Sequence, residues 1–218
     1  MPSRIRILWP LLRSAAIIAV VAGALLPVDD RLARPSLSRF DPDRLGRLEA
    51  AMWRDYYEHR WPALALDGLR VACDEYGFSW WDGFRSSLLA ARAALHFRGN
   101  TEDPRCLPLL ERYYAVLADG LGEKFDTVAA ARLELEWWRE RRRKLGPEDY
   151  AKTIAANVSV VYGLPPGTLA LPSLKRAQAM HYRDRHGRDG SMTEADWSEV
   201  ARQLGEAYGE LKAVAMSR

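Results

Sequence analysis

Apolar side chains recur every three or four residues along most of the sequence, which is the spacing of one face of an α-helix. The first clear stretch covers residues 42–60. Asp41 can accept a hydrogen bond from a backbone N–H of the first turn, and the ring of Pro42 suits the first helical position. Pro62 then ends or bends this helix. The residues that would share its apolar face are Leu45, Leu48, Met52 and Tyr56.

The same spacing predicts further helices downstream, and capping residues mark where several of them begin. Ser79 with Asp82, and Thr193 with Asp196, resemble capping boxes, in which two side chains satisfy the first backbone N–H groups. Asp126 is a further candidate cap. The predicted segments cover residues 63–76, 79–99, 103–120, 126–144, 147–162, 172–186 and 193–211.

Two of these segments have a recognisable start or a long apolar series. The segment at 103–120 opens on Asp103-Pro104, the same pair of residue types that opens the first helix. We therefore expect it to begin there in the same way. The segment at 79–99 has an apolar series at helical spacing, made of Trp80, Trp81, Phe84, Leu88, Ala91 and Leu95.

The composition favours helix throughout the chain. Ala, Leu, Arg and Glu dominate, and runs of β-branched residues are scarce outside residues 17–21. We predict an all-α fold with seven or eight helices in an antiparallel bundle-like array, because the predicted connections are short. Eight Trp and nine Tyr imply a well-filled core or an aromatic-lined cavity.

Residues 1–28 have the pattern of a targeting segment. A basic start precedes an apolar run at 14–28, which is shorter than the roughly 20 residues of a membrane-spanning helix. If Arg13 extends its guanidinium to the lipid headgroups, the run reaches back to Ile7 and suffices. Small residues at 22–24 also suit signal-peptide cleavage. We favour an uncleaved membrane anchor, with a cleaved signal segment and a buried helix of a cytosolic protein as alternatives.

The charges around this segment predict its orientation. Three arginines lie before the apolar run and Asp29-Asp30 directly follow it, so the N-terminus is expected in the cytoplasm. Residues 29–218 would then lie outside the cytoplasm, membrane-anchored or exported after cleavage. The predicted organisation is an N-terminal anchor or signal segment at 1–28, a linker at 29–40 and a single helical domain at 41–218.

The formal net charge of +3 comes from the arginines of residues 1–28. The remaining 29 basic residues equal the 29 acidic ones, so nucleic-acid binding is not expected. A basic run at 139–144 ends a predicted helix, where cations complement the helix dipole. Its use on anionic lipid is a less favoured alternative. The expected partners are the membrane, through residues 1–28, and a protein.

The sequence has no motif that identifies a metal site or a cofactor. Glu49 and Glu134 could be the single glutamates of a di-iron bundle, but such a site also needs two Glu-x-x-His pairs, and none occurs. No pair of closely spaced cysteines suggests zinc. We expect Cys73 and Cys106 to be buried thiols, with their pairing left open. A Gly-x-Ser-x-Gly nucleophile motif is also absent, and whether the protein is an enzyme stays open.

One set of aromatic and charged residues is a candidate ligand site. If the helices at 42–60 and 127–145 pack together, their carboxylates and arginines would meet among aromatic rings, as in an apolar pocket with a few polar groups. The other interpretation, which we favour, is a core in which buried Glu–Arg pairs fix the helix register. The candidate residues are Glu49, Trp53, Arg54, Tyr56, Tyr57, Glu134, Trp137, Trp138 and Arg141.

These observations predict a membrane-tethered helical domain that serves as a protein-interaction or scaffold module of the cell envelope. The alternative is a small-molecule-binding protein or enzyme, with its aromatic and carboxylate pocket between the helices at 42–60 and 127–145. A concave cavity lined by the candidate residues would favour the alternative.

Overall fold

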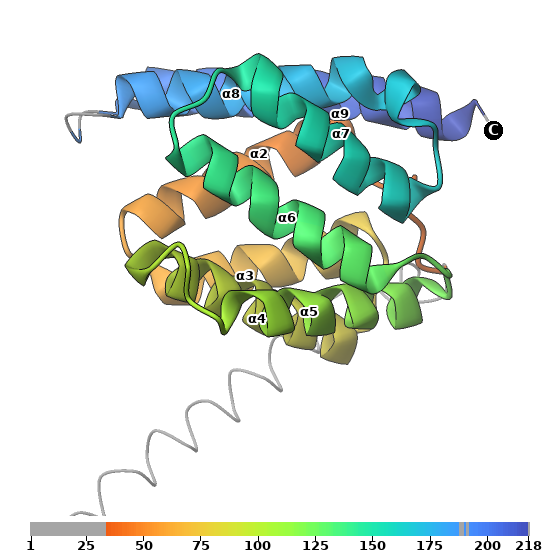
Figure 1. Ribbon diagram of the computed structural model, residues 1–218. Coiled ribbons are helices and arrows are strands. Elements are labelled where there is room, and N and C mark those ends of the chain that lie inside the picture. The colour runs from red at the N-terminus through yellow and green to blue at the C-terminus, as the bar shows by residue number, and fades with distance from the viewer. Residues whose placement is uncertain (1–33, 188–189, 191, 218) are drawn as a thin grey trace, which may run out of the picture. The chain divides into compact units, whose positions relative to one another are not determined.

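The computed structural model describes residues 34–187, 190 and 192–217. Over these residues the protein is built of helices joined by short connections, with no strand (Figure 1). The prediction of an all-α fold is therefore confirmed for this part of the chain. The hydrophobic segment predicted at 1–28 lies outside the described residues.

Eight α-helices are present in the described part of the chain, and short π-helical and 3-10 segments adjoin two of them. In chain order the elements are α2 (Pro42–Tyr57), α3 (Trp61–Arg70), η2 (Val71–Glu75), α4 (Trp80–Gly99), α5 (Cys106–Leu121), α6 (Thr127–Arg142), α7 (Pro147–Tyr162), η3 (Pro166–Leu169), α8 (Ala170–His186) and α9 (Glu194–Met216).

Several helix starts follow directly from local sequence. The Asp41 carboxylate accepts the backbone N–H of Arg44 at 2.7 Å, and Asp126 accepts two N–H groups at the start of α6. Thr193 and Asp196 form both halves of a capping box at α9. One predicted start is wrong. Helix α5 begins at Cys106, because the preceding Asp-Pro turn is held by its own ion pair with an arginine.

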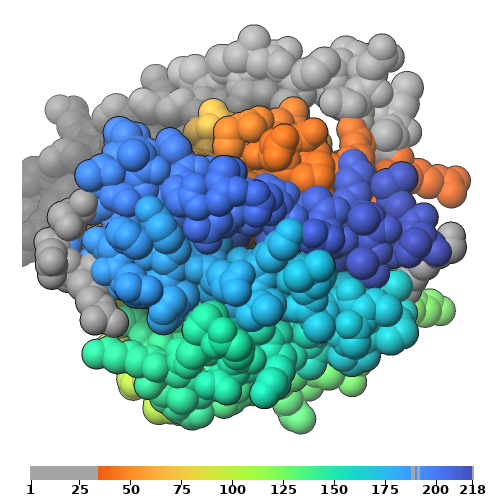
Figure 2. All heavy atoms as spheres, turned by 90° about the horizontal axis from the view of Figure 1, so that it is seen from above, coloured from red at the N-terminus to blue at the C-terminus, as the bar shows by residue number. Residues whose placement is uncertain are grey.

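The helices form a closed array. Each helix packs against the next one along the chain, and α9 packs against α2 through the most extensive of these interfaces. Figure 2 shows α9 lying between α2 and α8, with α7 and α6 on the far side of α8. In Figure 1, α3, α4 and α5 lie along one edge of the array and α8 and α9 along the opposite edge. The contact between α2 and α9 therefore closes a ring of helices.

Two glycines allow α2 and α9 to approach closely. Gly46 and Gly205 are both buried where the two helices cross. A Cβ at Gly46 would lie 2.5 Å from the backbone nitrogen of Gly205 and 2.8 Å from the carbonyl oxygen of Ala201. Both atoms belong to the backbone of α9, so neither can move aside as a flexible side chain could. The closing contact therefore depends on the absence of a side chain at Gly46.

The chain enters the ring beside the start of α4. The backbone N–H of Ser36 donates to the carbonyl oxygen of Tyr76 at 3.0 Å, and Tyr162 donates to the carbonyl of Leu37 at 3.1 Å. Phe40 is completely buried. Because Ser79 caps α4 three residues after Tyr76, the entry point and the start of α4 lie at the same end of the molecule.

Helix α4 buries Leu89, Phe97 and several small residues, and it leaves a second set of large apolar residues exposed. A Cβ at Gly83 would meet the Cys73 sulfur at 2.7 Å, so α4 lies close against η2. Ser86 and Ser87 are also on the buried side. Most of the predicted apolar series of this segment is exposed, namely Trp81, Phe84, Leu88 and Leu95.

Among the described residues, no single helix has the length and apolar character to cross a bilayer. Within the described part of the chain, one pair of helical segments meets these criteria jointly, namely α7 and the η3–α8 segment, which are bent by 118° relative to each other.

The glycine contact predicts a difference between two Gly→Ala substitutions. Alanine favours a helix over glycine by up to about 1 kcal/mol. At Gly46 this gain is outweighed by overpacking against α9, which typically costs about 1–3 kcal/mol. A Cβ at Gly209 of α9 would meet no atom within 4 Å, so this position serves as the control. Thermal unfolding followed by circular dichroism should show a lower Tm for Gly46→Ala and an equal or higher Tm for Gly209→Ala. Equal stabilisation by both would contradict the close contact.

Candidate functional site

Polar side chains from six helices meet inside the ring. We call them the interior polar network. Its members are Glu49 of α2, Tyr114 of α5, Glu134 of α6, Asn157 of α7, Arg176 of α8 and Tyr208 of α9. Each of these helices contributes one of the six, and the indoles of Trp137 and Trp138 on α6 also take part. The network therefore depends on the whole fold and not on one local motif.

The first half of the network is centred on Glu49. This carboxylate is 7% exposed and lies one turn after the glycine contact between α2 and α9. One oxygen accepts a hydrogen bond from Arg176 at 2.5 Å, and the other accepts one from the Tyr208 hydroxyl. Three helices are therefore tied together at one carboxylate.

Electrostatics keep Arg176 and Tyr208 in defined protonation states. Burial alone would lower the pKa of Arg176, but the adjacent Glu49 carboxylate holds it well above its ordinary value. Burial, assisted by the charge of Glu49, raises the pKa of Tyr208 well above its ordinary value. The guanidinium therefore stays charged and the phenol stays protonated as a hydrogen-bond donor.

The second half of the network is centred on Glu134. One of its oxygens accepts hydrogen bonds from the Tyr114 hydroxyl and the Trp137 indole, both at 3.0 Å. The other accepts the Trp138 indole N–H at 2.9 Å. Asn157 donates to the Tyr114 hydroxyl at 3.0 Å and so extends the network to α7. Burial, followed by the charge of Glu134, raises the pKa of Tyr114 well above its ordinary value.

Trp137 joins the two halves. Its indole N–H donates to Glu134, and the guanidinium carbon of Arg176 lies 5.5 Å from the centre of its ring. A cation over an indole face is attracted by the ring quadrupole, and this attraction grows where water is excluded. The network thus continues from Glu49 through Arg176 and Trp137 to Glu134.

A second polar cluster joins the C-terminal ends of α2, α6 and α8. Arg141 donates two hydrogen bonds of 2.7 Å to Asp184 and one of 2.9 Å to the Tyr57 hydroxyl. Its guanidinium carbon also lies 5.8 Å from the centre of the Trp53 ring. Burial alone would raise the pKa of Asp184, but the hydrogen bonds from Arg141 hold it below its ordinary value. Arg183 places its guanidinium over the other aromatic partner, Tyr57.

The other two candidate residues are Arg54, which lies outside both clusters, and Tyr56, whose ring packs edge-on against Tyr57 with ring centres 5.1 Å apart. Arg54 pairs with Glu58 and Glu194 at the surface, at 2.9 and 2.6 Å. Tyr56 packs edge-on against Trp61, with ring centres 6.2 Å apart. Their partners are thus at the C-terminal end of α2 and beyond it, so the two residues do not contribute to a shared site with Glu49.

The two helices that contain the candidate residues do not pack directly along each other. Helix α2 packs along α9 and α3, whereas α6 packs against α5 and α7. Glu49 and Glu134 each have their own donors. Sequence reasoning missed the donors Arg176, Tyr208 and Tyr114. It also missed Asn157, which donates to the Tyr114 hydroxyl. The sequence position of Arg176 could have identified it as an inward cation, because it lies within the apolar series of α8 beside Ala177.

The basic run at 139–144 is divided among several partners. Arg139 pairs with Glu102 at 2.8 Å and Arg143 with Glu136 at 3.3 Å. Arg141 faces the interior, as described above, and the guanidinium carbon of Arg142 lies 5.8 Å from the centre of the Phe97 ring. These side chains therefore point in different directions and do not form one continuous basic surface.

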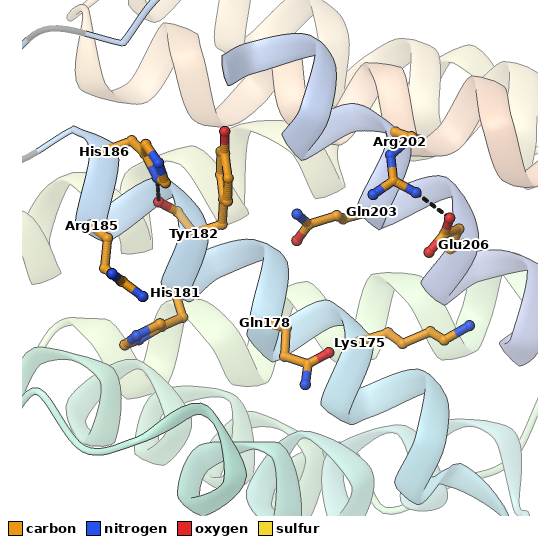
Figure 3. Close-up of a pocket in the computed structure, with 9 residues that line it drawn as sticks. All are labelled: Lys175, Gln178, His181, Tyr182, Arg185, His186, Arg202, Gln203 and Glu206. Atoms are coloured by element: carbon orange, nitrogen blue, oxygen red, sulfur yellow. Dashed lines mark hydrogen bonds and ion pairs between the residues drawn. The ribbon is translucent and has the colours of Figure 1, made fainter. Parts of the chain in front are cut away.

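Two recesses are found near the network, and neither is lined by any of the nine candidate residues. The smaller, beside Arg176 and Tyr208, holds about 20 Å³, which is room for about one water molecule. The larger is an open groove of about 350 Å³ between α8 and α9 (Figure 3). Two of the cations that line it, Arg202 and Lys175, form ion pairs with Glu206 and Glu210.

Within the described part of the chain, no group of three or more His, Cys, Asp or Glu side chains is arranged to hold a metal ion. Both cysteines are free thiols on different elements. Cys106 is buried in α5, and Cys73 is half-buried in η2.

Comparison of the chain with protein-family models, with curated proteins and with solved structures gave no significant match.

The Glu49 contacts predict a large effect of a small substitution. Glu49→Gln keeps the shape of the side chain but leaves the buried Arg176 guanidinium without an anion. Breaking a buried pair in this way typically costs about 3–5 kcal/mol. The control is Glu194→Gln, which removes an ion pair at a side chain that is 80% exposed, and little change is expected there. Chemical denaturation of both variants measures the difference. Equal stability of Glu49→Gln and wild type would show that the pair does not stabilise the ring.

The thiols should react slowly in the folded protein. Burial, with the nearby charges of Asp74 and Asp82, raises the pKa of Cys73 to about 11, so little thiolate is present at neutral pH. We expect intact-mass analysis to show no fast addition of iodoacetamide to the folded protein and two additions in denaturant without reductant. Absence of both additions in denaturant would instead indicate a disulfide between Cys73 and Cys106.

Proposed function

We propose that this protein is a membrane-tethered helical domain that serves as a protein-interaction or scaffold module of the cell envelope. The observation that most supports the proposal is the saturation of the interior carboxylates. All four oxygens of Glu49 and Glu134 accept a hydrogen bond from the protein itself. A carboxylate that binds a ligand or moves a proton needs an oxygen within reach of that ligand. These two are therefore suited to holding helices in register.

The sizes and positions of the two recesses weigh against the alternative function. A small-molecule-binding protein or enzyme with its pocket between the helices at 42–60 and 127–145 would need a cavity of several hundred Å³ there. The recess beside Arg176 holds only about 20 Å³. The larger groove lies between α8 and α9. Interaction through the surface of a firmly packed domain is the better supported function.

The tether in this proposal is residues 1–28. Its basic start and apolar run are typical of a membrane anchor, and Asp29-Asp30 after it favour an orientation with residues 29–218 outside the cytoplasm. Cleavage of the segment and export of the remainder is the alternative.

Protease accessibility in intact cells tests the tether and its orientation together. With an uncleaved anchor, the full-length chain should fractionate with the membrane. A protease added outside the cytoplasmic membrane should then degrade residues 29–218. A soluble shortened chain would favour cleavage and export. Protection of the domain until the membrane is permeabilised would contradict the proposed location.

A further inference from the structure

We propose that the outer face of α4 docks onto a lipid surface that contains anionic headgroups. We define this α4 outer face by its six exposed residues, Trp81, Phe84, Arg85, Leu88, Arg92 and Leu95. The inference rests on the membrane tether proposed above and adds the surface by which the domain contacts the bilayer.

The α4 outer face exposes four large apolar side chains. Trp81 is 59% exposed, Leu88 43%, Phe84 39% and Leu95 38%. They follow one another at helical spacing over fourteen residues, so they form a strip about 21 Å long. Scattered exposed apolar residues are ordinary, but a continuous strip indicates a surface that is covered by something.

The aromatic residues at one end of the strip form a preorganised group. The Trp80 and Phe84 rings stack 5.4 Å apart with an angle of 3° between their planes, and the Trp81 ring lies 6.1 Å from Phe84. Tryptophan is enriched where membrane and water meet, because its ring is apolar and its N–H remains polar. This end of α4 therefore has the chemistry of a membrane-interface anchor.

The charges of the face fit an anionic surface. Arg85 and Arg92 lie beside the strip, both exposed, and neither forms an ion pair or hydrogen bond with another described residue. The single acid of α4, Asp82, is engaged at the helix start, where it accepts a hydrogen bond from Ser79 at 2.7 Å. An apolar strip flanked by arginines, without an exposed carboxylate, is typical of helices that lie on anionic membranes.

The tether would bring this face to the bilayer. The apolar run ends at residue 28 and the described domain begins at residue 34, so the connection spans at most about 20 Å when fully extended. Ser36 is hydrogen-bonded to Tyr76, only five residues before Trp81. A membrane that holds residues 14–28 would therefore lie within reach of the aromatic end of α4.

A second copy of the chain fits the face less well. A strip about 21 Å long and about 10 Å wide is small beside the roughly 800 Å² that each partner buries in a stable dimer. Two copies related by symmetry would also bring Arg85 and Arg92 towards the same arginines of the partner, without acids between them. A lipid surface satisfies both the apolar residues and the charges.

The test uses the full-length chain with an environment-sensitive fluorophore on Leu88→Cys. The matched control has the same fluorophore on Gln178→Cys, an exposed position of α8 on the opposite edge of the array. Each is reconstituted into phosphatidylcholine vesicles with or without phosphatidylglycerol, and mock-labelled wild type measures the background from Cys73 and Cys106. Leu95→Cys repeats the measurement if Leu88→Cys impairs folding.

We expect the fluorophore at position 88 to shift to the blue in vesicles with phosphatidylglycerol, and to be quenched by brominated acyl chains. The fluorophore at position 178 should stay water-exposed. Replacing Arg85 and Arg92 by glutamine should lower the ratio of docked to undocked fluorophore about fivefold for each arginine.

Two outcomes would overturn the docking while leaving the tether intact. In the first, the chain floats with the vesicles but the fluorophore at position 88 stays water-exposed. In the second, the fluorophore is already buried in detergent and does not respond to lipid, which would indicate a second copy or another protein segment on α4. Failure of the chain to float with the vesicles would contradict the tether itself, and the docking with it.

Discussion

The burial of one carboxylate beside one guanidinium, Glu49 with Arg176, is the interaction on which the ring most depends. Glu49 lies where α2 meets α9, the first and last of the described helices, and Arg176 reaches it from α8. Gly46 and Gly205 bring the two backbones together one turn earlier. Each partner neutralises a charge that would otherwise be costly to bury. The contacts that close the ring therefore also neutralise its interior charges.

The interior and the surface of the molecule have different roles. The interior carboxylates are held by donors from several helices, which favours a rigid framework. The surface contains the features that a partner could recognise. Helix α4 has apolar residues on two sides, because Leu89 and Phe97 are buried in the core while Trp81, Phe84, Leu88 and Leu95 are exposed. An exposed apolar strip opposite a buried apolar face is expected if α4 contacts a second apolar environment.

Local features of the structure could be predicted from the sequence, and long-range ones could not. The caps at Asp41, Asp126 and Thr193 depend on neighbouring residues and were readable. The start of α5 was not, because the Asp103–Arg105 ion pair competes with the helix. Glu49 and Glu134 were identified as inward carboxylates, but their partners depend on which helices are neighbours. That information comes from contacts across more than a hundred residues, such as the one between Glu49 and Arg176.

A double-mutant cycle on Glu49 and Arg176 tests most directly whether their contact closes the ring. The free energy of unfolding is measured for Glu49→Gln, for Arg176→Gln and for the double variant. If the pair closes the ring, the double variant should lose clearly less stability than the sum of the single losses, with a coupling energy of about 1–3 kcal/mol. Additive losses, with no coupling beyond experimental error, would show that the two residues act independently and would contradict the central role of their contact.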